Sequence, residues 1–118
     1  MPEKARVFVA EDNKDWQEYI EKILNRAGHS VVARATTVEE GLKIIEQFGE
    51  LQVQVATIDG NLSEDDISGY DGRALVEAIG RHAPNVKTVG MSGLAMNGVT
   101  IDLGKGSIAK LGEVVTNL

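Results

Sequence analysis

The sequence contains no cysteine, so disulfide bonds, thiol chemistry and cysteine-based zinc or iron–sulfur sites are excluded. It has two histidines, His29 and His82, which stand far apart in the chain and cannot form a zinc site by themselves. It also lacks the run of about 18 to 20 apolar residues that a membrane-spanning helix needs. The sequence therefore predicts a soluble protein without sulfur chemistry and without a membrane partner.

Positive charge is also scarce, since 12 Lys and Arg stand against 18 Asp and Glu, giving a formal net charge of -6. Nucleic-acid binding depends on clustered basic side chains, so this balance argues against it as the main role. Residues 1–6 are polar and the apolar run that follows them is short, which is unlike a secretory signal. We expect a cytoplasmic protein that does not bind nucleic acid.

The chain of 118 residues has the size of one domain, and strand patterns alternate along it with helix patterns. Strands are predicted at residues 6–10, 30–36, 53–58, 86–91 and 99–103. Helices are predicted at residues 14–27, 71–82 and 107–118, and after a capping box at Thr37 and Glu40, with Leu42, Ile45 and Phe48 buried. This alternation favours a parallel sheet with helices on both faces.

Polar residues follow four of these strands, at the edge where open parallel sheets bind ligands: Glu11 and Asp12, Asp59, Ser92, and Lys105. Three carboxylates that lie close together repel one another unless a cation binds or a pKa rises. A hard divalent ion such as Mg²⁺ suits oxygen ligands. An aspartate beside such an ion, with a lysine and a hydroxyl nearby, is arranged to accept a phosphoryl group.

Three stretches, VFVAEDNKDW, VATIDGNL and VGMSG, are followed by a lysine before the last helix. In this order the sequence resembles the response-regulator receiver domains (CheY-like) of two-component signalling, over essentially the whole chain. The resemblance implies a flavodoxin-like, doubly wound five-stranded parallel sheet in the order 2-1-3-4-5. It also implies one receiver-like domain spanning residues 1–118, with no output domain attached.

The resemblance assigns a Mg²⁺ site to four residues. Asp12 matches the direct metal ligand of the acidic pair, and Glu11 matches the member that acts through water. Asp59 is the third carboxylate, and Asn61 offers its backbone carbonyl. Taken alone, an acidic pair after a strand is also a common helix N-cap, so its role as a metal site depends on this combination with Asp59.

The resemblance also assigns the phosphorylation chemistry. Asp59 matches the phosphoacceptor, which receives its phosphoryl group from the phosphohistidine of a sensor histidine kinase or a phosphotransfer protein. Ser92 matches the switch hydroxyl, and Lys105 matches the basic partner of the phosphoryl group, with Lys110 as an alternative lysine. Such a protein is not an enzyme beyond self-catalysed phosphotransfer and autodephosphorylation, and it signals through a downstream protein that the sequence does not identify.

The sequence departs from the family between Ser92 and Lys105, where it has fewer residues than usual. If residues 99–103 form the fifth strand, only residues 93–98 remain for the crossover, and glycines stand at both ends. Glycine disfavours a helix, and a short helix nucleates poorly. We therefore expect the family's fourth helix to be absent or reduced to one turn. So short a crossover also raises the alternative that the fifth strand is displaced or runs in another direction.

Other departures affect the surface that receiver domains use for signalling. Asp102 stands where the family has an aromatic switch residue, Gly106 replaces a proline, and residues 64–66 are an acidic run in a long loop. The main hypothesis is a stand-alone phosphoacceptor receiver in a phosphorelay. A receiver-like docking module that works without phosphorylation is the alternative. A small Mg²⁺-dependent phosphohydrolase is disfavoured, because the sequence after Asp59 lacks a second aspartate for acid–base work.

Overall fold

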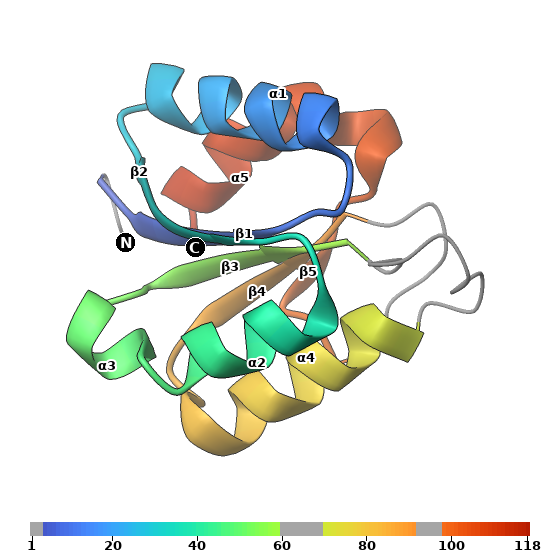
Figure 1. Ribbon diagram of the computed structural model, residues 1–118. Coiled ribbons are helices and arrows are strands. Elements are labelled where there is room, and N and C mark those ends of the chain that lie inside the picture. The colour runs from blue at the N-terminus through green and yellow to red at the C-terminus, as the bar shows by residue number, and fades with distance from the viewer. Residues whose placement is uncertain (1–3, 60–69, 92–97) are drawn as a thin grey trace.

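The protein is described by a computed structural model that covers residues 4–59, 70–91 and 98–118. Its strands form one parallel sheet in the order β2-β1-β3-β4-β5 (Figure 1). The strands are β1 (Arg6–Ala10), β2 (Ser30–Ala35), β3 (Val55–Ile58), β4 (Lys87–Gly90) and β5 (Ile101–Asp102). The predicted flavodoxin-like sheet is therefore confirmed.

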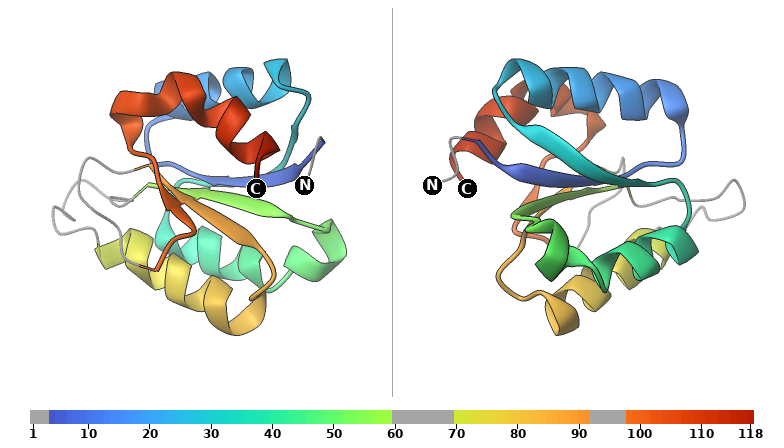
Figure 2. Two further views of the ribbon diagram at one scale, coloured as in Figure 1. Left: turned by 180° about the vertical axis from the view of Figure 1, so that it is seen from behind. Right: turned by 60° about the vertical axis from the view of Figure 1, so that its left-hand side comes forward.

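Helices cover both faces of this sheet. They are α1 (Lys14–Arg26), α2 (Val38–Ile45), α3 (Phe48–Leu51), α4 (Tyr70–His82), the 3₁₀ helix η1 (Lys105–Lys110) and α5 (Leu111–Thr116). Helices α1 and α5 lie side by side on one face, and α2 and α4 lie on the other (Figures 1 and 2). In the part of the chain that the structure describes, no helix combines the length and the apolar composition needed to cross a bilayer.

The central strand β1 shows why the sheet is buried on both faces. Successive side chains of a strand point to opposite sides. Phe8 and Ala10 accordingly join the core beneath α2 and α4, whereas Val7 and Val9 join the core beneath α1 and α5. All four are at most 1% exposed. A strand that buries both of its faces reads as a continuous apolar run, which is the pattern seen at residues 7–10.

Local signals in the sequence fix two helix starts. The Asn13 side chain accepts a hydrogen bond from the Trp16 backbone N–H at 3.0 Å, which caps α1. The Thr37 hydroxyl accepts from the Glu40 N–H at 3.2 Å, so the predicted cap of α2 is confirmed. The Glu40 carboxylate reaches back to the backbone N–H of Thr36 (2.9 Å), one residue earlier than in a standard capping box. That N–H bond lowers the pKa of Glu40.

The end of the sheet differs in part from the sequence prediction. Strand β5 spans two residues, rather than residues 99–103. It is nevertheless parallel to β4, with Val89 paired to Ile101, so the alternative of a displaced or reversed strand is wrong. Residues 91 and 98–100 are not helical. Residues 92–97 lie outside the described residues, and the missing fourth helix therefore stays a prediction.

Side-chain hydrogen bonds connect the chain to β4 just before β5 begins. The Thr88 backbone N–H donates to the Thr100 hydroxyl at 3.0 Å, and the Thr100 N–H donates to the Thr88 hydroxyl at 2.9 Å. This reciprocal pair holds the chain just before β5 against β4 without strand geometry. A short edge strand is thereby kept in register by threonine side chains.

Several helix details were wrong in the sequence prediction. Leu42 was predicted to be buried but is 40% exposed, and Tyr19, which fits the apolar period of α1, is 46% exposed. The second helix ends at Ile45, and Phe48 begins the separate helix α3, where its ring meets Phe8 edge-to-face at 5.2 Å. The last predicted helix is divided into η1 and α5, and Ser107, where it was predicted to begin, lies inside η1 with non-helical backbone angles.

Candidate functional site

An acidic cluster forms where β1 and β3 end. Ala10 pairs with Ile58 across these neighbouring strands, so the residues that follow them lie at the same edge. The Asp59 N–H continues the ladder by donating to the Ala10 carbonyl at 2.9 Å. Carboxylate oxygens of Glu11, Asp12 and Asp59 all lie within 4.8 Å of one another. The sheet register therefore brings the three predicted carboxylates together.

Lys105 reaches this cluster from the chain that follows the edge strand β5. Its ammonium nitrogen Nζ lies 3.0 Å from Glu11 Oε1 and 3.3 Å from Asp59 Oδ2. The backbone before it is anchored because the N–H groups of Leu103 and Gly104 both donate to the Gly90 carbonyl, at 3.0 and 2.9 Å. Lys110, the alternative lysine, is exposed at the end of η1. The short crossover therefore does not prevent Lys105 from meeting the carboxylates.

Burial makes the electrostatics of this cluster unfavourable when all its carboxylates are ionised. Glu11 is 0% exposed and Asp59 is 4% exposed. Burial, together with the hydrogen bond and the charge of Asp59, raises the pKa of Glu11 from 4.5 to about 8. Burial on its own would lower the pKa of Lys105, but the two carboxylates outweigh it and the pKa is raised. The cluster thus favours taking up a proton or a cation, as like charges at close range require.

The residues of the cluster suit a hard divalent cation. Glu11 Oε1 is fully buried and accepts no hydrogen bond from the described residues, so its described partner is the Lys105 ammonium. Carboxylate oxygens are the ligands that Mg²⁺ prefers, and a partly solvated site leaves room for the waters that it keeps. Asp12 supplies the solvent-accessible carboxylate of the three. Asn61 and Ser92, the other predicted site residues, lie outside the described residues.

One contact at the site was not predicted from the sequence. The Lys105 ammonium lies over the ring of Trp16, 5.2 Å from its centroid. The available signal was position, since Trp16 stands in the first turn of the helix that begins beside the acidic pair. That signal does not identify the lysine as its partner, because Lys105 comes from a distant part of the sequence.

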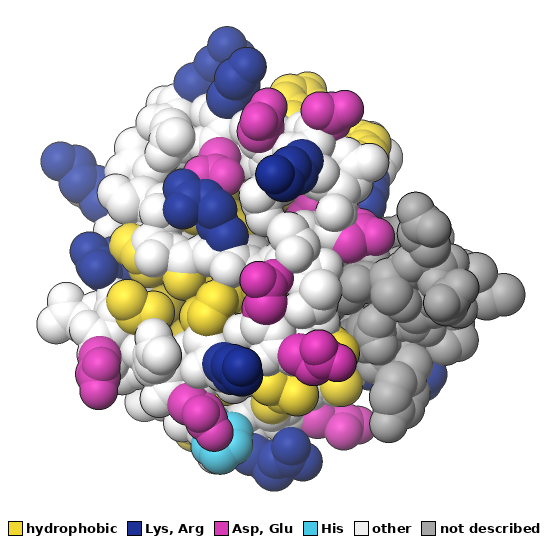
Figure 3. Space-filling model, viewed as in Figure 1, with side chains coloured by type: hydrophobic (Ala, Val, Ile, Leu, Met, Phe, Trp, Pro, Cys, Tyr) yellow, Lys and Arg dark blue, Asp and Glu magenta, His cyan; other side chains and the backbone are white. Residues whose placement is uncertain are grey.

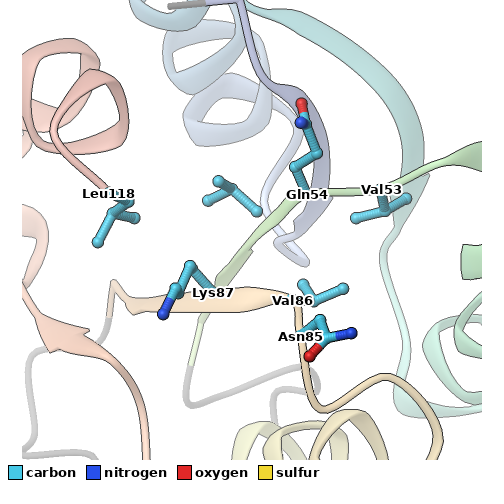
Figure 4. Close-up of a pocket in the computed structure, with 7 residues that line it drawn as sticks. Val53, Gln54, Asn85, Val86, Lys87 and Leu118 are labelled. Atoms are coloured by element: carbon cyan, nitrogen blue, oxygen red, sulfur yellow. The ribbon is translucent and has the colours of Figure 1, made fainter. Parts of the chain in front are cut away.

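The opposite edge of the sheet is chemically plain. A hollow of about 410 Å³ lies at the amino ends of β3 and β4, and Lys87 is the charged side chain among its lining residues Val53, Gln54, Val55, Asn85, Val86, Lys87 and Leu118 (Figure 4). It contains no cluster of acidic groups among these residues. Figure 3 shows acidic and basic side chains interspersed on one face of the molecule. The carboxyl edge of the sheet is therefore the candidate site.

Solved structures share the fold of this chain. A scan against protein-family models and a search of curated proteins both find no match. A CheY-like response regulator receiver domain from Methanospirillum hungatei JF-1 is 22% identical, with a TM-score of 0.77 over 97% of this chain and 92% of that one. The response regulator domain of Thermotoga maritima CheB is also 22% identical, with a TM-score of 0.67 over 97% of this chain and 89% of that one.

A third solved structure is similar to this chain at lower sequence identity. The signal receiver domain of a modulated diguanylate cyclase from Desulfovibrio desulfuricans G20, described as an example of alternate folding, is 15% identical. It matches with a TM-score of 0.62 over 93% of this chain and 76% of that one. The resemblance drawn from the sequence is thus confirmed at the level of architecture, and the chain has the fold of response-regulator receiver domains.

Proposed function

We propose that this chain is a phosphoacceptor receiver domain of a phosphorelay, with Asp59 as the residue that takes the phosphoryl group. One observation carries the proposal: the Asp59 carboxylate stands at the carboxyl end of the central strand pair, within 4.8 Å of the Glu11 and Asp12 oxygens and 3.3 Å from the Lys105 ammonium. A carboxylate nucleophile beside a positive charge is an arrangement that suits phosphoryl transfer.

The transfer step uses one oxygen of Asp59. That oxygen forms a bond to the phosphorus of a phosphohistidine, and the bond between phosphorus and the imidazole nitrogen breaks. The electron pair of the broken bond stays on the nitrogen, which takes a proton from solvent. Lys105 stabilises the negative charge on the phosphoryl oxygens, because its ammonium already faces the Asp59 carboxylate.

Glu11, Asp12, Asp59 and the backbone carbonyl of Asn61 would hold Mg²⁺ in this proposal. A bound Mg²⁺ would supply positive charge that offsets the negative charge of the phosphoryl oxygens. The raised pKa of Glu11 supports the assignment: it is caused first by burial and then by Asp59, and a bound cation would offset the cost of ionising this buried carboxylate. Ser92 is proposed as the hydroxyl that then responds to the phosphoryl group.

The partners follow from the same proposal. A sensor histidine kinase or a phosphotransfer protein supplies the phosphoryl group, and another protein reads the phosphorylated state. We place the protein in the cytoplasm, where these partners act, and we treat residues 1–118 as one receiver-like domain. It is not an enzyme in the ordinary sense, since its own carboxylate is consumed in each transfer.

Intact-mass spectrometry after incubation with Mg²⁺ and acetyl phosphate tests the proposal. Wild-type protein should gain one phosphoryl group, which hydroxylamine removes because it cleaves acyl phosphates. Asp59→Asn should gain none. Asp15→Asn is the matched control, since it makes the same chemical change at an exposed position in the first turn of α1 and should be phosphorylated like the wild type.

Two other outcomes would replace the proposal with its alternatives. If wild type and Asp59→Asn both stay unmodified while the protein binds Mg²⁺ weakly or not at all, a docking module that works without phosphorylation is favoured. Asp102 and the short strand β5 already set this chain apart from receivers that switch through an aromatic residue. Sustained release of inorganic phosphate without a trapped adduct would favour a phosphohydrolase.

A further inference from the structure

The backbone around Lys105 gives its side chain little support. Gly104 precedes it with a positive φ of 76°, a conformation that glycine adopts readily, and Gly106 follows it. The strand before it has two residues. Four rotatable side-chain bonds separate the anchored backbone from the ammonium, so the position of the ammonium is set mainly by what it touches.

Among the described residues, three groups touch the ammonium: the Glu11 carboxylate at 3.0 Å, the Asp59 carboxylate at 3.3 Å and the Trp16 ring at 5.2 Å from its centroid. A cation is attracted to the face of an indole at this distance. The two carboxylates are the groups that a divalent cation or a phosphoryl group would engage, whereas the indole stays available in every state of the site. Trp16 is therefore the partner of Lys105 that does not change.

Trp16 is itself fixed to the acidic edge. The Asn13 N–H donates to Glu11 Oε2 at 3.2 Å, and the Asn13 side chain accepts the Trp16 backbone N–H at 3.0 Å. The Trp16 ring then meets the Lys105 ammonium, which returns to Glu11 through the ion pair. The contacts therefore form a ring that begins and ends at Glu11 and passes through the first turn of α1 and the lysine.

We propose that Trp16 is a positioning residue, which holds the Lys105 ammonium next to Asp59 through its ring face. Its effect on phosphorylation rests on the proposed function, but the contact between Trp16 and Lys105 does not. The simpler role for Trp16 is apolar packing, because its ring also lies against the core beneath α1 and α5. The two roles differ in one respect: packing would matter whether or not the lysine is present.

A double-mutant cycle on the rate of phosphorylation by acetyl phosphate and Mg²⁺ separates these roles. Trp16→Leu, which keeps an apolar side chain without a ring, should slow the reaction about threefold to tenfold. Trp16→Phe, which keeps a ring face, should recover most of the rate. In the Lys105→Met background, Trp16→Leu should change the rate less than twofold. If Trp16→Leu is as fast as wild type, or slows the Lys105→Met protein equally, the proposal is wrong.

Fluorescence tests the contact without any phosphorylation, because Trp16 is the single tryptophan of the chain. In metal-free protein, Lys105→Met should change the wavelength or intensity of its emission. Lys110→Met, which removes an exposed lysine five residues further along, should leave the emission unchanged. Identical spectra for all three proteins would overturn the proposal. A changed spectrum together with no phosphorylation of wild type would instead leave the contact established and reject the proposed function.

Discussion

The acidic and basic halves of the site are built in different ways. Glu11 and Asp59 follow β1 and β3, which pair residue by residue from Val7 to Ala10 and are buried on both faces. Lys105 follows β5, which pairs with β4 through two residues. Backbone ladders position the carboxylates, whereas threonine side chains, two bonds to the Gly90 carbonyl and the ring of Trp16 position the lysine.

The carboxylates are therefore held more rigidly than the lysine side chain. A carboxylate that accepts a phosphoryl group must be placed by rigid elements, because small displacements cost much of the rate. A lysine that faces two carboxylates in one state and a phosphoryl group in another needs freedom to follow. The described sheet places Asp59, the proposed nucleophile, after a regular strand pair and Lys105, its proposed charge partner, after the two-residue strand β5.

The largest effect should come from the acidic half, through pH. Because the folded protein raises the pKa of Glu11 from 4.5 to about 8, folding holds this proton more tightly than the unfolded chain does. The free energy of unfolding of the metal-free protein should therefore be highest below pH 4.5, as far as this group is concerned. It should fall by on the order of 4 kcal/mol as pH rises to about 8.

Urea unfolding between pH 5 and pH 8 measures this dependence. Glu11→Gln should flatten it, and saturating Mg²⁺ should do the same in wild type because the ion replaces the proton. Glu18→Gln, at an exposed position of α1, should retain the wild-type dependence. Stability that rises with pH over this range in metal-free wild type would contradict the assignment.

A second test removes the hydrogen bonds of His29, which hold α5 after Lys105 and η1. The Ala5 N–H donates to His29 Nδ1 at 2.9 Å, and His29 Nε2 lies 3.0 Å from the Thr116 hydroxyl, so this buried ring ties β1 to α5. His29→Leu would leave the Ala5 N–H unpaired and should lower the free energy of unfolding by about 1 to 3 kcal/mol. His82→Leu, at an exposed position, is the control, and equal urea midpoints for both variants would rule out the anchor.

The threonine pair offers a sharper test of the basic half alone. Thr100→Val removes the acceptor of the Thr88 N–H and should lower the free energy of unfolding by about 1 to 2 kcal/mol. Hydrogen exchange should accelerate at the Leu103 and Gly104 amides, which hold the chain before Lys105, and stay unchanged at the Asp59 amide. Equal acceleration at Asp59 would show that the two halves are not held independently.

The smallest effect should come from a helix start outside both halves. Thr37→Ala removes the side-chain cap of α2 and should lower the free energy of unfolding by about 1 kcal/mol. Mg²⁺ affinity, measured by calorimetry, should stay within twofold of wild type because no site residue belongs to α2. A large loss of affinity would show that stability anywhere in the fold controls the site.

The sheet and the acidic half could be predicted from the sequence for physical reasons. Continuous apolar runs identify strands buried on both faces, and parallel strands in this topology must bring their carboxyl ends to one edge. The positions of Glu11 and Asp59 follow from these rules alone. The helix caps at Asn13 and Thr37 follow from local hydrogen bonding, which depends on a few adjacent residues.

The basic half was harder to predict because it depends on contacts between distant residues. The chain before β5 is held to β4 by a pair of threonine side chains that no strand pattern records. The Trp16 contact joins α1 to η1, which lies far away in the sequence. Tyr19 and Leu42 fit an apolar helical period, but the helices turn those positions outward. The period of apolar residues shows which face of a helix is apolar. It does not show how much of that face the neighbouring sheet or helices cover.

A crystal grown with Mn²⁺, which scatters anomalously and takes the same oxygen ligands as Mg²⁺, tests the central claim most directly. We expect one anomalous peak within bonding distance of carboxylate oxygens from Asp12 and Asp59, and the Lys105 ammonium on the opposite side of Asp59 from the ion. A map with no peak there at a saturating concentration of Mn²⁺, or with the two carboxylates turned away from each other, would contradict it.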